Sequence, residues 1–216
     1  MQSLIFDAAA DPAINYGAAG AVIGHEITHQ FDDQGRTTDA DGVRRDWWTQ
    51  ADAAAFKARA DMLGAQYAQF EPLPGMHMNP GLTMGGSLAD LGGLTIALDA
   101  YHGSLKGAKA PVLHGLTSDQ RVFLGWAKAW AGKAQPEAIR RQTASDPHSF
   151  RKFRVNGVVR NIDGWYRPSA SSQMTRFIWP RTSVHTSGKH AASARRRALD
   201  LDARAQRQAV AAERAA

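Results

Sequence analysis

The chain has 216 residues, of which 44% are hydrophobic and 21% charged, which suffices for one ordinary core and excludes two sizeable domains. It contains no cysteine, so disulfides and thiolate metal sites are excluded and any transition metal must be held by imidazole and carboxylate groups. The net charge is +6, and because no run is long and apolar enough to span a membrane, we expect no membrane segment in this chain.

The first predicted helix begins at Asp11-Pro12 and continues to about Asp32. The aspartate is a candidate N-cap, proline suits the first helical position, and apolar residues then recur at helical spacing. Gly20 and Gly24 would each weaken this helix by about 1 kcal/mol relative to alanine. Their presence indicates close packing against another element, and we expect Gly35 to close the helix.

Two further long helices are predicted in the middle of the chain. Residues 36–46 are polar and rich in turn formers, and the alanine-rich stretch from about Trp48 to Phe70 predicts a helix. The prolines and glycines of residues 72–81 predict a loop. The next helix is expected from about Ser87 to Leu105, with Gly85-Gly86 at its entrance.

The last predicted elements are shorter. Thr117 and Gln120 stand at capping-box spacing before a fourth helix that is expected to continue to about Ala134, with its tryptophans in the core. Pro136 occupies the permitted first position of a short fifth helix. Residues 146–165 are expected to be irregular or to form short strands.

The C-terminal part differs in composition from the rest of the chain. Seven basic and three acidic side chains within residues 189–216 give this segment a charge of +4, and it has no phenylalanine, tyrosine or tryptophan. Single-stranded nucleic-acid binders use aromatic side chains for stacking, so a solvated arm is expected and nucleic-acid binding is not. We divide the chain into a domain, residues 1–182, and an Ala/Arg-rich low-complexity tail, residues 183–216, that is disordered or loosely helical.

The strongest motif is His25-Glu26-Ile27-Thr28-His29, inside the first predicted helix. Histidines four residues apart lie on one face of a helix and can bind the same metal ion. Glu26 then lies beside the metal without binding it, where its carboxylate can take a proton from metal-activated water and return it to the leaving amine. The motif predicts zinc-dependent peptide hydrolysis, and the alternative is two surface histidines on a polar helix face.

A catalytic zinc normally has three protein ligands, so a third must be found outside the motif. Glutamate is scarce, and none of the others stands in an evident site motif. Asp90 is the best-placed alternative, because small residues precede it and let its helix approach the first helix. Asp32 and Asp33 follow His29 by three and four residues, and they either orient its ring or serve as helix-end carboxylates in a turn.

Several short segments accompany the motif, in one order, over about residues 5–166. They are Asn15-Tyr16-Gly17, Val22-Ile23-Gly24, Phe31-Asp32-Asp33, Gly35-Arg36, Trp47-Trp48-Thr49, Ala89-Asp90, Gly92-Gly93, Asp146-Pro147-His148-Ser149 and Phe153-Arg154. Together with the motif they make the chain resemble the neprilysin and endothelin-converting-enzyme family of zinc metallopeptidases. Matches in this order are far more specific than the zinc motif alone.

The resemblance implies a fold and an activity. The fold would be mainly α, a thermolysin-like zincin catalytic lobe of which this chain carries a part. The activity would be that of a zinc metalloendopeptidase, which hydrolyses peptide substrates with zinc-activated water. His25 and His29 would bind one Zn²⁺ ion, and Glu26 would be the general base.

The resemblance also implies roles for three residues outside the motif. Asp90 would be the carboxylate that holds a zinc-bound imidazole. His148 would stabilise the developing oxyanion, and Arg154 would contact backbone carbonyl groups of the substrate. Without the resemblance, His148 would be interpreted as an ordinary loop histidine.

The largest departure from the family falls at the third zinc ligand. The family has Glu-Asn-Ile-Ala-Asp where this chain has Gly86-Ser87-Leu88-Ala89-Asp90, so a residue without a side chain replaces the ligating glutamate. Loss of a partner that only orients a ligand costs roughly 10- to 100-fold in metal affinity or activity, and a missing ligand should cost more. Weakened zinc affinity is therefore expected, and a catalytically inactive remnant with residual metal or peptide binding is the alternative function.

Other departures concern the surroundings of the site. Phe150-Arg151 stands where the family usually has Pro-Gly, and the family pattern disappears after Tyr166. The family's large upstream portion is expected to be missing, so apolar surface that it covers should be exposed and self-association is expected. Family members usually work outside the cytoplasm, as periplasmic, secreted or membrane-anchored proteins, but residues 1–20 lack the pattern of a signal peptide.

Overall fold

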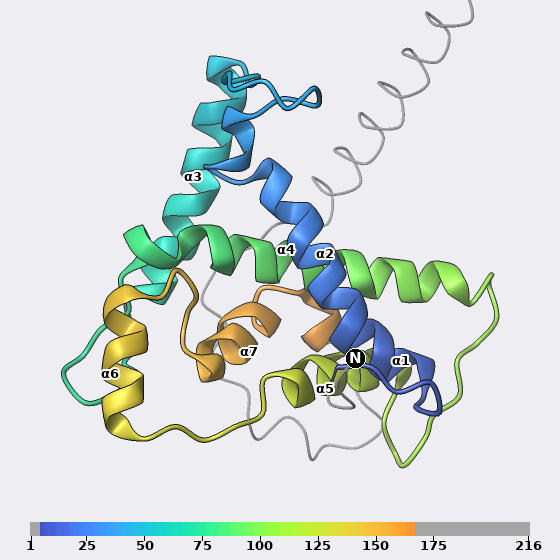
Figure 1. Ribbon diagram of the computed structural model, residues 1–216. Coiled ribbons are helices and arrows are strands. Elements are labelled where there is room, and N and C mark those ends of the chain that lie inside the picture. Colours follow the sequence, from blue (N-terminus) through green and yellow to red (C-terminus); the bar gives the residue numbers. More distant parts are fainter. Residues whose placement is uncertain (1–4, 167–216) are drawn as a thin grey trace, which may run out of the picture. The chain divides into compact units, whose positions relative to one another are not determined.

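The structure, a computed structural model, describes residues 5–166 (Figure 1). These residues form helices and short 3₁₀ or π-helical segments, and their β structure is limited to three isolated bridges. The mainly α prediction is therefore confirmed. The predicted tail, residues 183–216, and the boundary at residue 182 lie outside the described residues. In residues 5–166, no helix is both long enough and apolar enough to cross a membrane.

The first predicted helix is confirmed, with a local change of hydrogen-bonding pattern inside it. The side chain of Asp11 caps its first turn by accepting from the backbone N–H of Ala13. The successive segments are α1 (Pro12–Asn15), a π-helical stretch (Tyr16–Gly20), α2 (Ala21–Thr28) and a 3₁₀ turn (His29–Phe31). Such π segments insert an extra residue into a helix, and they are frequent at functional sites.

The helix α2 crosses α4 (Pro80–Ser104) at a backbone-to-backbone contact formed by two glycines (Figure 1). A Cβ atom on Gly24 would lie 2.8 Å from the carbonyl oxygen of Gly93, and one on Gly93 would lie 2.4 Å from the amide nitrogen of His25. Only glycine allows so close an approach. The close packing predicted at Gly24 is therefore confirmed.

Gly20 also lies beside α4, but an added Cβ there would be 3.7 Å from Ala97 Cβ, an ordinary contact distance, so this packing does not require glycine. Gly17 is the tightly packed residue of this segment, because a Cβ there would lie 1.8 Å from the carbonyl oxygen of Val122. Gly35 does not close the helix as predicted, since the helix ends at Phe31 and Gly35 begins a separate 3₁₀ turn (Gly35–Thr37).

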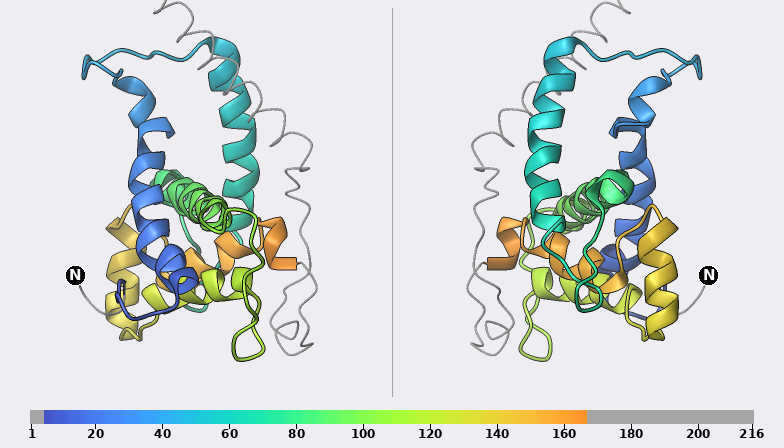
Figure 2. Two further views of the ribbon diagram at one scale, coloured as in Figure 1. Left: turned by 90° about the vertical axis from the view of Figure 1, so that its right-hand side faces the viewer. Right: turned by 90° about the vertical axis from the view of Figure 1, so that its left-hand side faces the viewer.

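The predicted second helix is confirmed as α3 (Gln50–Tyr67), which begins at a capping box of Thr49 and Asp52. Hydrogen bonds from Thr49 lower the pKa of the Asp52 carboxyl group below its usual range. Figure 2 views α4 nearly end-on and shows α2 and α3 on opposite sides of it. The long helix α4 therefore positions both of its neighbours.

The start of α4 corrects two predictions. The helix begins at Pro80, seven residues before the predicted start, because proline is well suited to a first turn and the Asn79 side chain accepts from the Gly81 N–H. Gly85 and Gly86 consequently lie inside the helix rather than at its entrance. They were expected to mark a boundary because glycine is a poor helix former.

The C-terminal helices confirm two predictions and correct two. The capping box of Thr117 and Gln120 begins α5 (Ser118–Ala129), which ends five residues before the expected end, and α6 (Pro136–Ser145) begins at Pro136 as predicted. The segment expected to be irregular contains α7 (Arg151–Val159) and a 3₁₀ turn (Asp163–Tyr166). Its valines favour strands as isolated residues, but in α7 they pack against the core.

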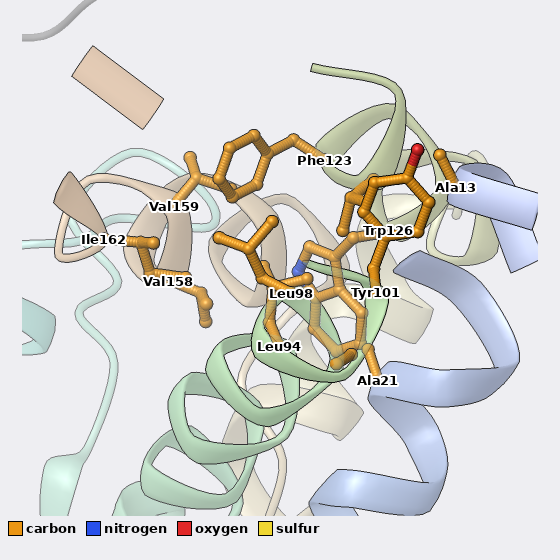
Figure 3. Close-up of a cluster of buried hydrophobic side chains, with 12 residues drawn as sticks. Ala13, Ala21, Leu94, Leu98, Tyr101, Phe123, Trp126, Val158, Val159 and Ile162 are labelled. Atoms are coloured by element: carbon orange, nitrogen blue, oxygen red, sulfur yellow. The ribbon is translucent and has the colours of Figure 1, made fainter. Parts of the chain in front are cut away.

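The main core lies where α4, α5 and α7 meet beneath the first helix (Figure 3). Its fully enclosed members include Leu94, Val122 and Trp126, so the prediction that this tryptophan belongs to the core is confirmed. A second cluster is formed by Leu63, Tyr67, Met78 and Phe153. Both clusters contact α7 and α4, the helices that carry residues of the candidate site.

Candidate metal centre

The two histidines of the motif point their Nε2 atoms toward one another at the C-terminal end of the first helix. His25 is buried in α2, His29 follows one turn later, and their Nε2 atoms lie 3.0 Å apart. Two nitrogens bound to one tetrahedral zinc at the usual 2.0–2.1 Å are separated by about 3.3 Å. The pair therefore has the spacing that a shared zinc ion requires, with little rearrangement.

A buried carboxylate holds the ring of His25 through its Nδ1 atom. Its Nδ1 atom lies 2.8 Å from Oδ1 of Asp90, which is 1% exposed. Arg154 donates to both oxygens of the same carboxylate, from Nε at 2.8 Å and from Nη2 at 2.6 Å. A proton on Nδ1 leaves the Nε2 lone pair for a metal. Because both oxygens of Asp90 already have partners, the structure does not favour Asp90 as the third ligand.

Arg154 is fixed by two tryptophans as well as by Asp90. Its guanidinium carbon lies 3.6 Å from the centre of the Trp130 ring, and Trp126 donates from Nε1 to the Arg154 carbonyl oxygen at 2.9 Å. The arginine is 8% exposed. Its observed contacts hold the carboxylate of the His25 pair, and the predicted contact with substrate carbonyls stays a prediction.

The ring of His29 has a carboxylate partner of its own. Its Nδ1 atom lies 2.7 Å from Oδ2 of Asp32, whose other oxygen accepts the backbone N–H groups of Gln34 and Gly35. Asp32 therefore combines the two roles considered for it, because it orients the ring and also stabilises the turn after the helix. Asp33 contacts the side chain of Gln34 instead of the ring.

A third imidazole lies next to this pair. The ring of His148 stacks on that of His25, with centroids 5.9 Å apart, and its Nδ1 atom lies 3.0 Å from Oδ1 of Asp146. One ring nitrogen from each of His25, His29 and His148 lies within 4.8 Å of the others, so the three could hold a metal ion. The structure thus brings together three histidines, two from one helix and one from a loop more than a hundred residues later.

His148 packs against Gly86, the glycine that stands where the resemblance implies the third ligand. A Cβ atom on Gly86 would lie 2.9 Å from Cδ2 of His148 and 3.1 Å from the carbonyl oxygen of Pro147. Beside this contact, the buried hydroxyl groups of Ser87 and Ser149 lie 3.1 Å apart. The loop before α7 therefore packs directly on α4, in space that a larger residue 86 would occupy.

Glu26 lies between the two histidines in sequence and is solvent-exposed. Its carboxylate is therefore accessible to water at the end of the helix that carries His25. The exposed apolar side chains of this helix, Ile23, Ile27 and Phe31, lie at four-residue spacing. Exposed apolar surface was expected without a stated position, and self-association stays a prediction.

Two residues of the site, Asp146 and Trp130, had no role predicted for them from the sequence. Asp146 was part of a matched segment without a role, although an aspartate two positions before a histidine in a turn is a local signal for an Nδ1 partner. Trp130 was expected in the core, and it does pack against the core while also covering the guanidinium of Arg154. This second role depends on a contact between distant segments and has no local signal.

A family model and individual known proteins both match most of this chain. Residues 1–172 match the model of Peptidase family M13. Human endothelin-converting enzyme 1 is 40% identical over 169 residues, which cover 74% of this chain and 21% of that enzyme. Neprilysin-1 of Caenorhabditis elegans is 41% identical over 169 residues, covering 74% of this chain and 22% of that protein.

A solved structure agrees with this relationship. The inhibitor complex of zinc metalloprotease Zmp1 from Mycobacterium tuberculosis is 52% identical and superposes with a TM-score of 0.72, covering 76% of this chain and 26% of that one. The chain thus spans about a fifth of the length of the two relatives named above and about a quarter of this structure.

Proposed function

The chain belongs to Peptidase family M13, and from this premise we propose that it binds one zinc ion at His25 and His29 and hydrolyses peptide bonds. One observation carries the proposal. The Nε2 atoms of the two histidines lie 3.0 Å apart, while each Nδ1 lies within 2.8 Å of a buried carboxylate oxygen. This arrangement fixes both rings with their lone pairs directed to one point.

Each side chain of the site has a proposed task. Zinc, when bound, lowers the pKa of water to about 7 and polarises a carbonyl group. Glu26 accepts the proton of the attacking water and returns it to the leaving amine. Asp90 and Asp32 hold the two rings in one orientation, and Arg154 holds the Asp90 carboxylate in place by donating to both of its oxygens. In this proposal His148 is available to donate to the developing oxyanion, and Arg154 adds a contact to the substrate backbone.

A second candidate function is a non-catalytic zinc- or peptide-binding remnant. It is favoured by Gly86, which has no side chain at the position where the family has the ligating glutamate. Peptide substrates, self-association through the exposed apolar face of α2 and the family's location outside the cytoplasm are proposed on the same family ground. Each of these proposals can be tested independently of zinc binding.

Replacing Glu26 with glutamine separates the two candidate functions. The variant should keep its zinc affinity within about threefold while hydrolysis of a quenched fluorescent peptide falls by at least 100-fold, since general-base catalysis contributes about 10² to 10⁴ in rate. The matched control is Glu137→Gln on the exposed face of α6, which should keep both properties. Equal, zinc-dependent hydrolysis by Glu26→Gln and the natural chain would exclude Glu26 as the base. Zinc binding without hydrolysis in the natural chain would identify the remnant.

A further inference from the structure

We propose that His148 is the third zinc ligand of this chain, in place of the glutamate that Gly86 replaces. This inference rests on the proposed zinc site at His25 and His29, and it changes the composition of that site to three histidines. Catalytic zinc sites with three histidines and one open position are an established type. The assignment is carried by the common geometry of the three rings and by the space at Gly86.

The three imidazoles share one arrangement. Each has a carboxylate oxygen within 3.0 Å of its Nδ1 atom, so each can present the lone pair of Nε2 to a metal. The pairs are His25–Asp90, His29–Asp32 and His148–Asp146. Carboxylate partners of this kind characterise zinc-binding histidines because they fix the tautomer and raise the basicity of the ligand. The third pair gives His148 the same support that the two histidines of the motif have.

The ring nitrogens of the three histidines lie farther apart than a shared zinc ion requires, but side-chain rotation can close the difference. Ligand atoms of the three histidines lie within 4.8 Å, and a tetrahedral zinc needs about 3.3 Å, so a shift of about 1.5 Å suffices. The side chains of His148 and Asp146 are 37% and 39% exposed, on the loop before α7. The two can therefore move together without disturbing the core.

The glycine and the histidine form a matched pair. A Cβ on residue 86 would approach Cδ2 of His148 to 2.9 Å, so a side chain at this position would require the His148 ring to shift. Glycine removes the oxygen ligand and at the same time opens the space in which an imidazole can replace it.

The two carboxylates that contact the paired histidines already have hydrogen-bond partners. Both oxygens of Asp90 accept hydrogen bonds, as do both oxygens of Asp32. Across residues 5–166, the three histidines are the one group of at least three convergent metal-binding side chains. A neutral ligand in place of glutamate also leaves more positive charge on the ion, and a zinc-bound His148 can no longer donate to an oxyanion. The inference thus replaces the oxyanion role proposed above for His148, and slow hydrolysis is expected to accompany zinc binding.

The test is the zinc affinity of the full-length chain, measured by competition with a chromophoric chelator, with His148→Ala as the key variant. The affinity should fall by more than about 100-fold, because loss of a direct ligand exceeds the roughly 10- to 100-fold cost of losing an orienting partner. His77→Ala, a histidine on an exposed loop, is the matched control and should bind as the natural chain does. The spectrum of the cobalt-substituted protein should change in His148→Ala and should not change in the control His77→Ala.

A rescue variant makes the test specific. In the His148→Ala background, Gly86→Glu should restore affinity at least tenfold, because the removed imidazole vacates the space that a glutamate needs. Affinity within threefold of the natural chain in His148→Ala would overturn the inference. If zinc binding depends on His25 and not on His148, the proposed zinc site stands and the inference alone fails. If the natural chain binds no more zinc than His25→Ala, the proposed function fails as well.

Discussion

Replacing Gly93 with alanine is expected to destabilise the protein by about 3 kcal/mol or more and to weaken zinc binding at the same time. The added methyl group would lie 2.4 Å from the amide nitrogen of His25 and 2.5 Å from the carbonyl oxygen of Ala21. These are backbone atoms, so relief requires that α2 move away from α4. Overpacking of a core costs about 1 to 3 kcal/mol and occasionally more, and a backbone clash belongs at the upper end.

The same helix provides the control for this prediction. A Cβ on Gly103 meets no atom within 4 Å, so Gly103→Ala should be neutral or stabilise the helix by up to about 1 kcal/mol. Urea unfolding of both variants measures the difference in the free energy of unfolding. Equal stability of the two variants would mean that α2 and α4 are not in backbone contact at Gly93.

Replacing Asp90 with alanine is expected to reduce both stability and metal binding. The change leaves the buried guanidinium of Arg154 without its bidentate partner, and breaking a buried ion pair in this way costs about 3 to 5 kcal/mol. It also frees the ring of His25, which should lower zinc affinity roughly 10- to 100-fold. Asp99→Ala, on an exposed face of the same helix, should change neither quantity.

A double variant separates the two effects of Asp90. Adding Arg154→Met to Asp90→Ala removes the unpaired charge and should recover part of the lost stability, because replacing both members of a buried pair by apolar groups is often tolerated. Zinc affinity should stay low, since the ring of His25 still lacks its carboxylate. Recovery of zinc affinity in the double variant would show that Asp90 supports the site only through overall stability.

Local sequence signals predicted the parts of the fold that depend on neighbouring residues. The first helix, the motif on one face of it and the capping box before α5 all follow from side-chain spacing and cap chemistry. The same reasoning placed the start of α4 too late, because a cluster of prolines and glycines was interpreted as a loop although Pro80 begins the helix. The helix α7 was missed because its valines pack against the core from a helix.

The candidate site was also predictable only in part, because local sequence signals do not determine contacts between distant segments. His25, His29 and Glu26 follow from one motif, and the resemblance added Asp90, His148 and Arg154. The approach of His148 to Gly86, across sixty residues of chain, depends on how the loop before α7 packs on α4. No spacing rule encodes such a contact. The absence of the glutamate could therefore be recognised from the sequence, but the packing of the His148 ring against Gly86 could not.

The zinc content of the purified full-length chain tests the central claim most directly. After removal of loosely bound metal, elemental analysis should find about one zinc per chain in the natural protein, and almost none in His25→Ala and His29→Ala, since each variant loses one of the few ligands of the site. Folding of the variants is checked by their urea unfolding midpoints. A zinc content in His25→Ala or His29→Ala equal to that of the natural chain would contradict a metal centre at the paired histidines.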